Sequence, residues 1–303
     1  MQLILQETGF QGQPWPVKYL GVPLSLGRNK TVLFDGVIAS VRAKLHHWSS
    51  RFLSAGGKLI LIRHVLSSMP LYLLQVTKPP KGIFLRLGKL FNAFLWDGKD
   101  GRRIHWFSWE KVCFPVEEGG LGFRSLLDLE RAFAMKLWWT IRQKSSPWAR
   151  FMHRKYIGEQ HPCLVSAAVG SATWKRVCLV RAITEDNIRW RLGEEFIDLW
   201  YDRWLFNEPL SRQVTGAPPH FLVAEFYTST GWNTDRLLQV LPRSIVNIIS
   251  QTLVDPKLKD ELIWAPSAAA TFFVSSAWAL VRKRRNMSLV CRGFWCPLPP
   301  LQS

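Results

Sequence analysis

Apolar residues recur at steps of three and four through most of the first 157 residues, and this spacing limits the fold more than any other feature of the chain. A stripe with this spacing covers one side of an α-helix, so each stretch has to bury that side against a neighbour. Prolines separate several of the stretches and mark helix ends. The spacing predicts helices over residues 31–48, 58–68, 81–96, 126–142 and 148–156.

The helical pattern stops near residue 158, where small residues and a proline appear. We expect a linker over residues 158–170. The pattern beyond it is mixed. It predicts helices at 172–181, 236–240, 243–253 and 275–285, strands at 187–191 and 196–200, and a hairpin formed by Trp264 and residues 271–274.

Two short stretches of the first half indicate β-structure. Residues 17–22 lie between prolines and contain a Gly turn, which favours a small hairpin. Residues 104–114 mix aromatic and β-branched side chains, which predicts a short strand or an irregular packed segment. The predicted fold class is therefore mainly α, a helical bundle with a short N-terminal β-hairpin, followed by a smaller mixed α+β region.

The basic charge of the chain is concentrated in its first half. The net charge is +18, and residues 1–160 hold 24 Lys and Arg against 10 Asp and Glu, whereas residues 161–280 hold 11 against 12. Charge of this density attracts polyanions, of which nucleic acid is the commonest and anionic membrane the next. The apolar stretches are far shorter than the roughly 18 residues of a spanning helix, so we expect no membrane partner.

Signals for cell compartment are few. The amino terminus lacks the basic start and the apolar run of a secretory signal, and the five cysteines have no paired spacing. We therefore expect an intracellular protein without disulfides. The basic residues 282–285 fit either a nuclear import signal or a charged helix end. Most of the 16 tryptophans are predicted to lie in the core, among them Trp48, Trp96, Trp138 and Trp148.

A series of short motifs runs through the chain in a fixed order. The motifs are Lys-Tyr-Leu-Gly-Val-Pro-Leu at 18–24, Leu-Ser-Ala-Gly-Gly-Lys-Leu-Ile-Leu-Ile at 53–62, Val-Leu-Ser-Ser-Met-Pro-Leu-Tyr at 65–72, Phe-Leu-Trp-Asp-Gly at 94–98, Gly-Gly-Leu-Gly at 119–122 and Phe-Val-Ser-Ser-Ala-Trp at 273–278. In order and spacing they resemble the part of plant LINE-type non-LTR retrotransposon reverse transcriptases that follows the catalytic palm. The resemblance covers nearly the whole chain, and its landmarks are densest before residue 156.

The resemblance implies a division of the chain into five segments. These are a primer-grip-like hairpin at 1–28, a basic helical thumb-like region at 29–157, a linker at 158–170, a near-neutral mixed α/β linker region at 171–258 and the truncated start of the family's zinc-binding region at 259–303.

The resemblance also implies a nucleic-acid-binding site. In reverse transcriptases the hairpin after the palm contacts the primer end, and Tyr19, Leu20 and Gly21 take that position. A Gly turn lets the backbone approach a sugar-phosphate strand closely, although Tyr19 is as readily explained as a core aromatic. The basic residues that we expect at backbone phosphates are Arg42, Lys44, Lys58, Arg63, Lys81, Arg86, Lys89, Arg102 and Arg103.

Catalytic groups are not evident in the sequence. Polymerisation in this family needs carboxylates on two metal ions, including two adjacent aspartates, and the sequence has no Asp-Asp pair. We predict no catalytic residue and expect the palm upstream of this chain in an intact relative. Glu194, Glu195, Asp198 and Asp202 form the densest acidic group. A metal-dependent nuclease built on them is conceivable, but the alternating residues around them favour a packed strand whose acids face water.

Metal and ligand signals are equally sparse. Cys291 and Cys296 have a half-site spacing for zinc, yet no His follows them, so we predict no metal site and no cofactor. We predict a non-catalytic fragment of an RNA-directed DNA polymerase that binds RNA or an RNA–DNA hybrid by electrostatic contact, without a small-molecule substrate. The alternative is an inactive structural or protein-interaction remnant. The sequence leaves the oligomeric state open.

Overall fold

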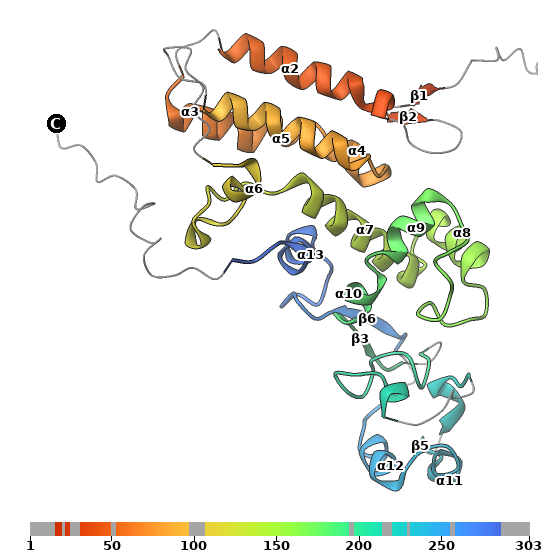
Figure 1. Cartoon of the computed structure of the whole chain (residues 1–303). Helices are drawn as coiled ribbons and strands as arrows, with labels where there is room; N and C mark the ends of the chain where they lie inside the picture. The colour runs from red at the N-terminus through yellow and green to blue at the C-terminus, as the bar shows by residue number, and fades with distance from the viewer. Residues whose placement is uncertain are drawn as a thin grey trace, which may run out of the picture. The chain divides into compact units, whose positions relative to one another are not determined.

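A computed structural model describes residues 16–19, 22–24, 31–49, 53–96, 107–193, 197–213, 220–228, 231–254 and 258–285 (Figure 1). The chain forms two compact units: unit 1 comprises residues 1–133 and 281–303, and unit 2 comprises residues 134–280. The described residues are mostly helical, with a hairpin near the amino terminus and two further strand pairs in unit 2. The predicted fold class is confirmed, whereas the five-segment division stays a prediction.

Unit 1 opens with the predicted hairpin. Strand β1 (Val17–Tyr19) pairs antiparallel with β2 (Val22–Leu24), and Tyr19 lies opposite Val22. Val22 is buried, which fixes one side of the hairpin.

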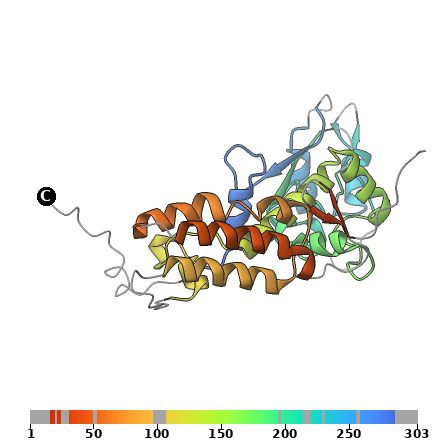
Figure 2. The ribbon, with the colours of Figure 1, turned by 90° about the horizontal axis from the view of Figure 1, so that it is seen from above.

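Three helical segments form the body of unit 1 and lie side by side in Figure 2. The first is a 3₁₀ turn, η1 (Thr31–Phe34), followed by α2 (Asp35–Ser49). The second is α3 (Ala55–Leu61), which continues into a π-helical turn, η2 (Ile62–Leu66), and is followed by α4 (Leu71–Val76). The third is α5 (Lys81–Leu95). Their apolar stripes meet in a core that includes Phe34, Ile38, Val41, Ile62, Leu66, Leu87 and Phe91.

The second helical segment begins three residues earlier than its apolar spacing predicts. The Ser54 hydroxyl accepts a hydrogen bond from the backbone N–H of Gly57 at 3.2 Å, so Ser54 caps α3 and the helix includes both glycines before Lys58.

A short helix corrects the expectation for residues 104–114. Residues 109–112 form α6 (Trp109–Val112) rather than a strand. Trp109 packs on α5, where the position of a Cβ on Gly88 would lie 2.7 Å from the indole ring, and it also stacks on Phe123. The aromatic residues that suggested a strand therefore serve helix packing. A turn, η3 (Val116–Glu118), follows.

The long helix α7 (Leu126–Gln143) contains the boundary between the two units, and α8 (Pro147–Tyr156) follows it in unit 2. Both were predicted. Unit 2 continues with α9 (Ala172–Cys178) and α10 (Arg181–Glu185).

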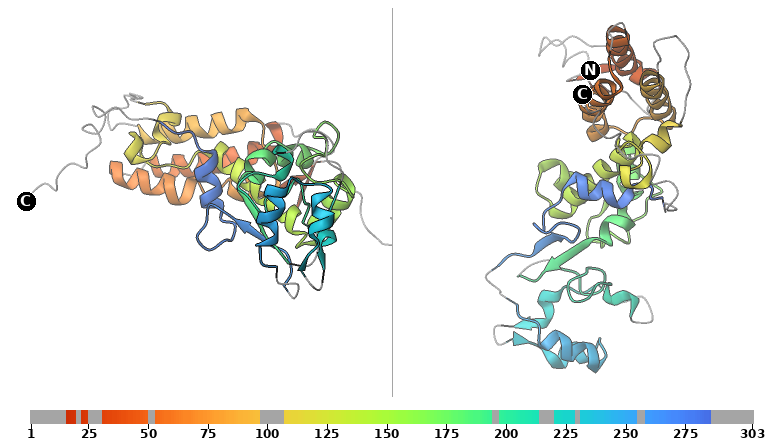
Figure 3. Two further views of the ribbon diagram at one scale, coloured as in Figure 1. Left: turned by 90° about the horizontal axis from the view of Figure 1, so that it is seen from below. Right: turned by 90° about the vertical axis from the view of Figure 1, so that its left-hand side faces the viewer.

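The only strand pair with four residues on each side, among those described, joins distant parts of unit 2. Strand β3 (Ile188–Arg191) pairs antiparallel with β6 (Glu261–Trp264), as the right-hand view of Figure 3 shows. The predicted hairpin of Trp264 with residues 271–274 is therefore wrong. The partner of β6 is β3, and the backbone N–H of Trp264 instead closes a turn with the carbonyl of Ala270 at 2.7 Å.

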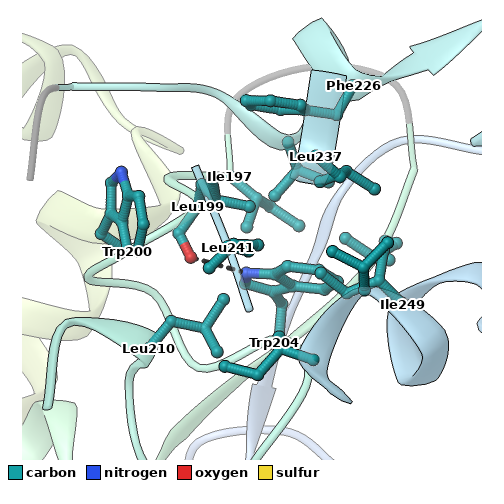
Figure 4. Packing of buried hydrophobic residues seen from close by; sticks show 13 residues of the cluster. Ile197, Leu199, Trp200, Trp204, Leu210, Phe226, Leu237, Leu241 and Ile249 are labelled. Atoms are coloured by element: carbon teal, nitrogen blue, oxygen red, sulfur yellow. Dashed lines mark hydrogen bonds between the residues drawn. The ribbon is translucent and has the colours of Figure 1, made fainter. Parts of the chain in front are cut away.

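The predicted strand at 196–200 is also wrong over its described residues, 197–200. They make one isolated bridge, between Asp198 and Leu222, and then turn. The core explains why, because Leu199, Trp200 and Trp204 are all buried in one cluster (Figure 4). A strand would point neighbouring side chains to opposite faces. The Trp204 indole N–H donates to the carbonyl oxygen of Leu199 at 3.1 Å and fixes the turn.

The same cluster holds most of the remaining elements of unit 2. Short turns η4 (Leu210–Arg212) and η5 (Val223–Phe226) lead into β4 (Tyr227–Thr228), which pairs with β5 (Gly231–Trp232). Helices α11 (Thr234–Leu238) and α12 (Arg243–Ser250) cover the cluster. Helix α13 (Val274–Val281) comes last and ends four residues earlier than predicted.

Candidate nucleic-acid interface

The described part of the predicted site is confined to unit 1. Tyr19 belongs to β1 by its backbone, while Leu20, Gly21, Arg102 and Arg103 lie outside the described residues, as does the Tyr19 side chain. The other predicted residues are distributed over three helical segments. Arg42 and Lys44 lie on α2, Lys58 on α3, Arg63 on η2, and Lys81, Arg86 and Lys89 on α5.

One ion pair shows how α2 and α5 align. The Arg86 guanidinium lies 2.9 Å from a carboxylate oxygen of Asp35 at the start of α2. Arg42 is seven residues after Asp35 and so returns to the same side of α2, and Lys89 is one turn after Arg86 on α5. Because η1 and α2 both contact α5, this spacing places Arg42 and Lys89 on the sides of α2 and α5 that carry the ion pair.

Besides Arg63 and Arg86, four predicted cations are exposed to solvent: Arg42, Lys44, Lys81 and Lys89. None of the described carboxylates forms an ion pair with them. Their charge therefore acts outward, on whatever polyanion approaches unit 1. Arg86 contributes less, because Asp35 neutralises it locally.

Two predicted cations are held by the protein itself. The Lys58 ammonium lies 5.8 Å from the centre of the Phe94 ring. The Arg63 guanidinium donates to the carbonyl oxygen of Leu121 at 2.8 Å and lies 5.7 Å from the centre of the Phe123 ring. A guanidinium fixed in this way keeps its charge and its remaining N–H donors for a ligand.

Arg63 belongs to a pocket of about 450 Å³ in unit 1. One wall is the π-helical turn with the residues after it, and the other is the segment that leads into α7. The lining is Arg63, His64, Ser67, Ser68, Leu71, Gly122, Phe123, Arg124 and Leu129. Guanidinium groups together with hydroxyls are the donors that phosphate oxygens accept from.

Sequence reasoning missed most of this pocket. It identified Arg63, but the pocket also takes Ser67 from the end of the π-helical turn and Gly122 and Arg124 from a distant segment, where Gly122 adopts a left-handed backbone with φ of 71°. A Cβ at Gly122 would also lie 3.5 Å from a guanidinium nitrogen of Arg63. The Gly-Gly-Leu-Gly motif was a usable signal for this turn, whereas periodicity does not distinguish a π-helical turn from an α-helix.

The basic run at 282–285 forms ion pairs and a hydrogen bond with other residues of unit 1. Arg282 pairs with Glu118 at 2.7 Å, Lys283 pairs with Glu110, and the backbone N–H of Arg285 donates to Glu118 at 3.0 Å. Lys283 is nevertheless two thirds exposed. Nuclear import through this run stays a prediction.

The acidic group of unit 2 is a buried network. Asp198 and Asp202 are only 3% and 4% exposed, so the expectation that these acids face water is wrong, and Glu194 and Glu195 lie outside the described residues. Asp202 pairs with the Arg142 guanidinium and lies 3.1 Å from Nε2 of His161.

A second carboxylate completes this network. Glu185 lies 3.1 Å from Nε of Arg142 and accepts the indole N–H of Trp138 at 2.6 Å. Burial alone would raise the pKa of Asp202, but Arg142 and His161 hold this pKa at about 2. The Asp202 carboxylate therefore stays ionised at neutral pH, and its pair with Arg142 joins α7 to the turn at Asp202.

The described cysteines and acids form neither a reactive thiol nor a cluster of metal ligands. Cys113, Cys163 and Cys178 are free thiols, and burial raises the pKa of both Cys113 and Cys163 to about 12. Within the described ranges no three His, Cys, Asp or Glu side chains gather as metal ligands, and Cys291 and Cys296 lie beyond those ranges. None of the described helices is long and apolar enough to cross a membrane.

Two plant proteins are similar in sequence to this chain. The chain is 28% identical over 280 residues to a protein of Arabidopsis thaliana named "Putative ribonuclease H protein"; the match covers 86% of this chain and 45% of that protein. It is 26% identical over 148 residues to an uncharacterized mitochondrial protein of the same plant, a match that covers 46% of this chain and 95% of the relative. No family model matches the chain, and no solved structure matches it. The chain thus resembles plant proteins, and it spans less than half of the first of them.

Proposed function

We propose that this chain is the nucleic-acid-binding, non-polymerising part of a retrotransposon RNA-directed DNA polymerase, and that unit 1 binds RNA or an RNA–DNA hybrid through backbone phosphates. The observation that carries the proposal is the set of exposed cations on α2 and α5, which have no ion-pair partner among the described carboxylates. The order of sequence motifs and the similarity to a plant protein named as a ribonuclease H support the retroelement origin.

The geometry favours contact with the backbone rather than with base edges. Arg42 and Lys89 lie on straight helices whose cationic side follows the seam between α2 and α5. Contacts of this kind position a strand without reading its sequence. The pocket at Arg63 adds a place where one phosphate is held by fixed donors, because Arg63 is already anchored to Leu121.

Binding to a labelled RNA–DNA hybrid, titrated from low to physiological salt, tests the proposal. The informative variant changes Arg42, Lys44, Lys81 and Lys89 to Gln. Its control changes to Gln four exposed cations of unit 2 that form no ion pair with a described carboxylate, namely Lys136, Lys175, Arg243 and Lys259, so that both variants have the same net charge. We expect the unit 1 variant to bind more weakly and to lose about 0.9 from the salt slope for each phosphate contact removed, while the control changes little.

Two results oppose the proposal. Equal weakening in both variants means that total charge, rather than the exposed cations of α2 and α5, determines binding. Loss of all binding by the unaltered chain at physiological salt means that the cationic surface has no such function, and it favours the inactive structural or protein-interaction remnant.

A further inference from the structure

Helix α8 exposes two aromatic residues, of which Trp148 was wrongly predicted to lie in the core (α8 in Figure 1). Trp148 is 36% exposed and Phe151 is 56% exposed. The side of α8 that packs into unit 2 is instead formed by Ala149 and Met152, which are buried. The helix is therefore anchored on its small side and presents its aromatic side outward.

The local sequence fixes this orientation. The Ser146 hydroxyl accepts the backbone N–H of Ala149 at 3.1 Å, and Pro147 follows the cap in the first helical position. Both features define where α8 starts and hence which residues share a face.

Basic residues share the outward face with the aromatic ones. Steps of three and four bring the basic residues and Phe151 together over a shallow concavity of about 480 Å³, while Trp148 lies outside its lining. The lining residues are Pro147, Arg150, Phe151, Arg154 and Lys155. No described carboxylate forms an ion pair with Arg150, Arg154 or Lys155. The Lys155 ammonium lies 5.4 Å from the centre of the Phe151 ring, so a cation and a π-face are already held side by side.

We propose that this face of α8 binds an unpaired nucleic-acid strand, with bases stacked on Phe151 and Trp148 and with Arg150 and Arg154 at the flanking phosphates. An aromatic plane between cations matches a polymer that alternates flat bases with negative charges. Arg150 and Arg154 are one helical turn apart, about 6 Å along the axis, so they approach different parts of one backbone. The inference does not depend on the proposal for unit 1, since the two surfaces share no residue.

A fluorescence experiment on the full chain tests this face. The probes are a single-stranded oligo-uridine of about ten nucleotides, within the usual site size of such surfaces, and an RNA–DNA hybrid of the same length. The variant is Trp148→Ala with Phe151→Ala. The control is Leu179→Ala, which removes a 71% exposed apolar side chain elsewhere in unit 2, and circular dichroism checks that both fold.

We expect the double variant to lose about tenfold or more in affinity for oligo-uridine, as loss of a stacked base typically costs. The hybrid, whose bases are paired, should lose less than about twofold. The Leu179 control should leave both affinities unchanged.

Three outcomes overturn the inference. The first is unchanged affinity of the double variant for oligo-uridine. The second is an equal loss for strand and hybrid, because paired bases do not stack on the protein. The third is that the double variant loses binding to vesicles of phosphatidylcholine and phosphatidylserine, or to poly-glutamate, while oligo-uridine binding stays intact, which would assign the face to a lipid surface or to an acidic chain.

Discussion

Among the described residues, units 1 and 2 both have exposed basic side chains, but they differ in that unit 2 also buries some in ion pairs. In unit 1 Arg42, Lys44, Lys81 and Lys89 extend into solvent from helix surfaces, whereas in unit 2 Arg142 and Arg203 are buried and paired with carboxylates. Arg142 stabilises the fold and has no charge left over for a ligand. The difference teaches that a count of basic residues does not locate a binding surface, because the partner of each cation decides where its charge acts.

The largest effect that separates the two kinds of cation is expected at Asp202. Asp202→Asn leaves Arg142 buried with one carboxylate instead of two, which should lower the free energy of unfolding of unit 2 by about 3 kcal/mol. Urea unfolding followed by tryptophan fluorescence measures it. The matched control is Glu261→Gln, the same chemical change in the exposed pair with Arg191, with an expected loss below about 1 kcal/mol. Equal losses would break the comparison.

The stability of unit 2 at acid pH should depend on the same network. The pKa of Asp202 in the folded state, about 2, lies below the ordinary value of 3.8 for this side chain. The carboxylate therefore stabilises unit 2 fully above pH 4, and this contribution, about 2 kcal/mol, is lost as the pH falls from about 4 to about 2. Unfolding free energies between pH 5 and pH 2 measure it, and the pH dependence in this window should shrink in Asp202→Asn. An unchanged dependence in that variant would show that other acids cause it.

A close backbone contact in unit 1 provides a stability test that does not involve charge, for comparison with the ion-pair variants of unit 2. A Cβ on Gly120 would lie 2.0 Å from the carbonyl oxygen of Phe114, so Gly120→Ala should destabilise unit 1 by about 2 kcal/mol. Thermal unfolding is the measurement. Stability within about 0.5 kcal/mol of the unaltered chain would mean that the turn after α6 is free to shift.

The smallest expected change is a gain. Gly36 lies in α2 with nothing within 4 Å of its Cβ position, so Gly36→Ala should raise the stability of unit 1 by about 0.5 to 1 kcal/mol through helix propensity. Affinity for the RNA–DNA hybrid should not change. Lower affinity in this variant would place the strand against the start of α2 and would redraw the interface there.

Sequence reasoning recovered most of the helices, because each buries a regular apolar stripe. It failed where packing overrode local pattern. Trp109 suggested a strand but packs on α5 from a short helix, and Trp264 suggested a hairpin but pairs with a strand more than 70 residues earlier. The residues next to Trp109 and Trp264 in the sequence do not indicate that these partners are α5 and β3.

The site was recovered in part for a similar reason. Exposed lysines on α2 and α5 follow from their place off the apolar stripe, so their positions were predictable. The pocket at Arg63 and the outward face of α8 were not. Trp148 and Met152 both fit an apolar stripe, and only the tertiary structure shows that Met152 is buried and Trp148 exposed.

The pairing of β3 with β6 sets an order in which unit 2 is completed during synthesis. Ile188 emerges from the ribosome 76 residues before Trp264, its partner. Until then β3 is a strand edge with unsatisfied N–H and C=O groups. The long loop between β3 and β6 has to close, at a cost in chain entropy, before the hydrogen bonds of the pair can form. A chain that terminates before residue 261 would retain that open edge, and it is therefore expected to aggregate more readily than the full-length chain.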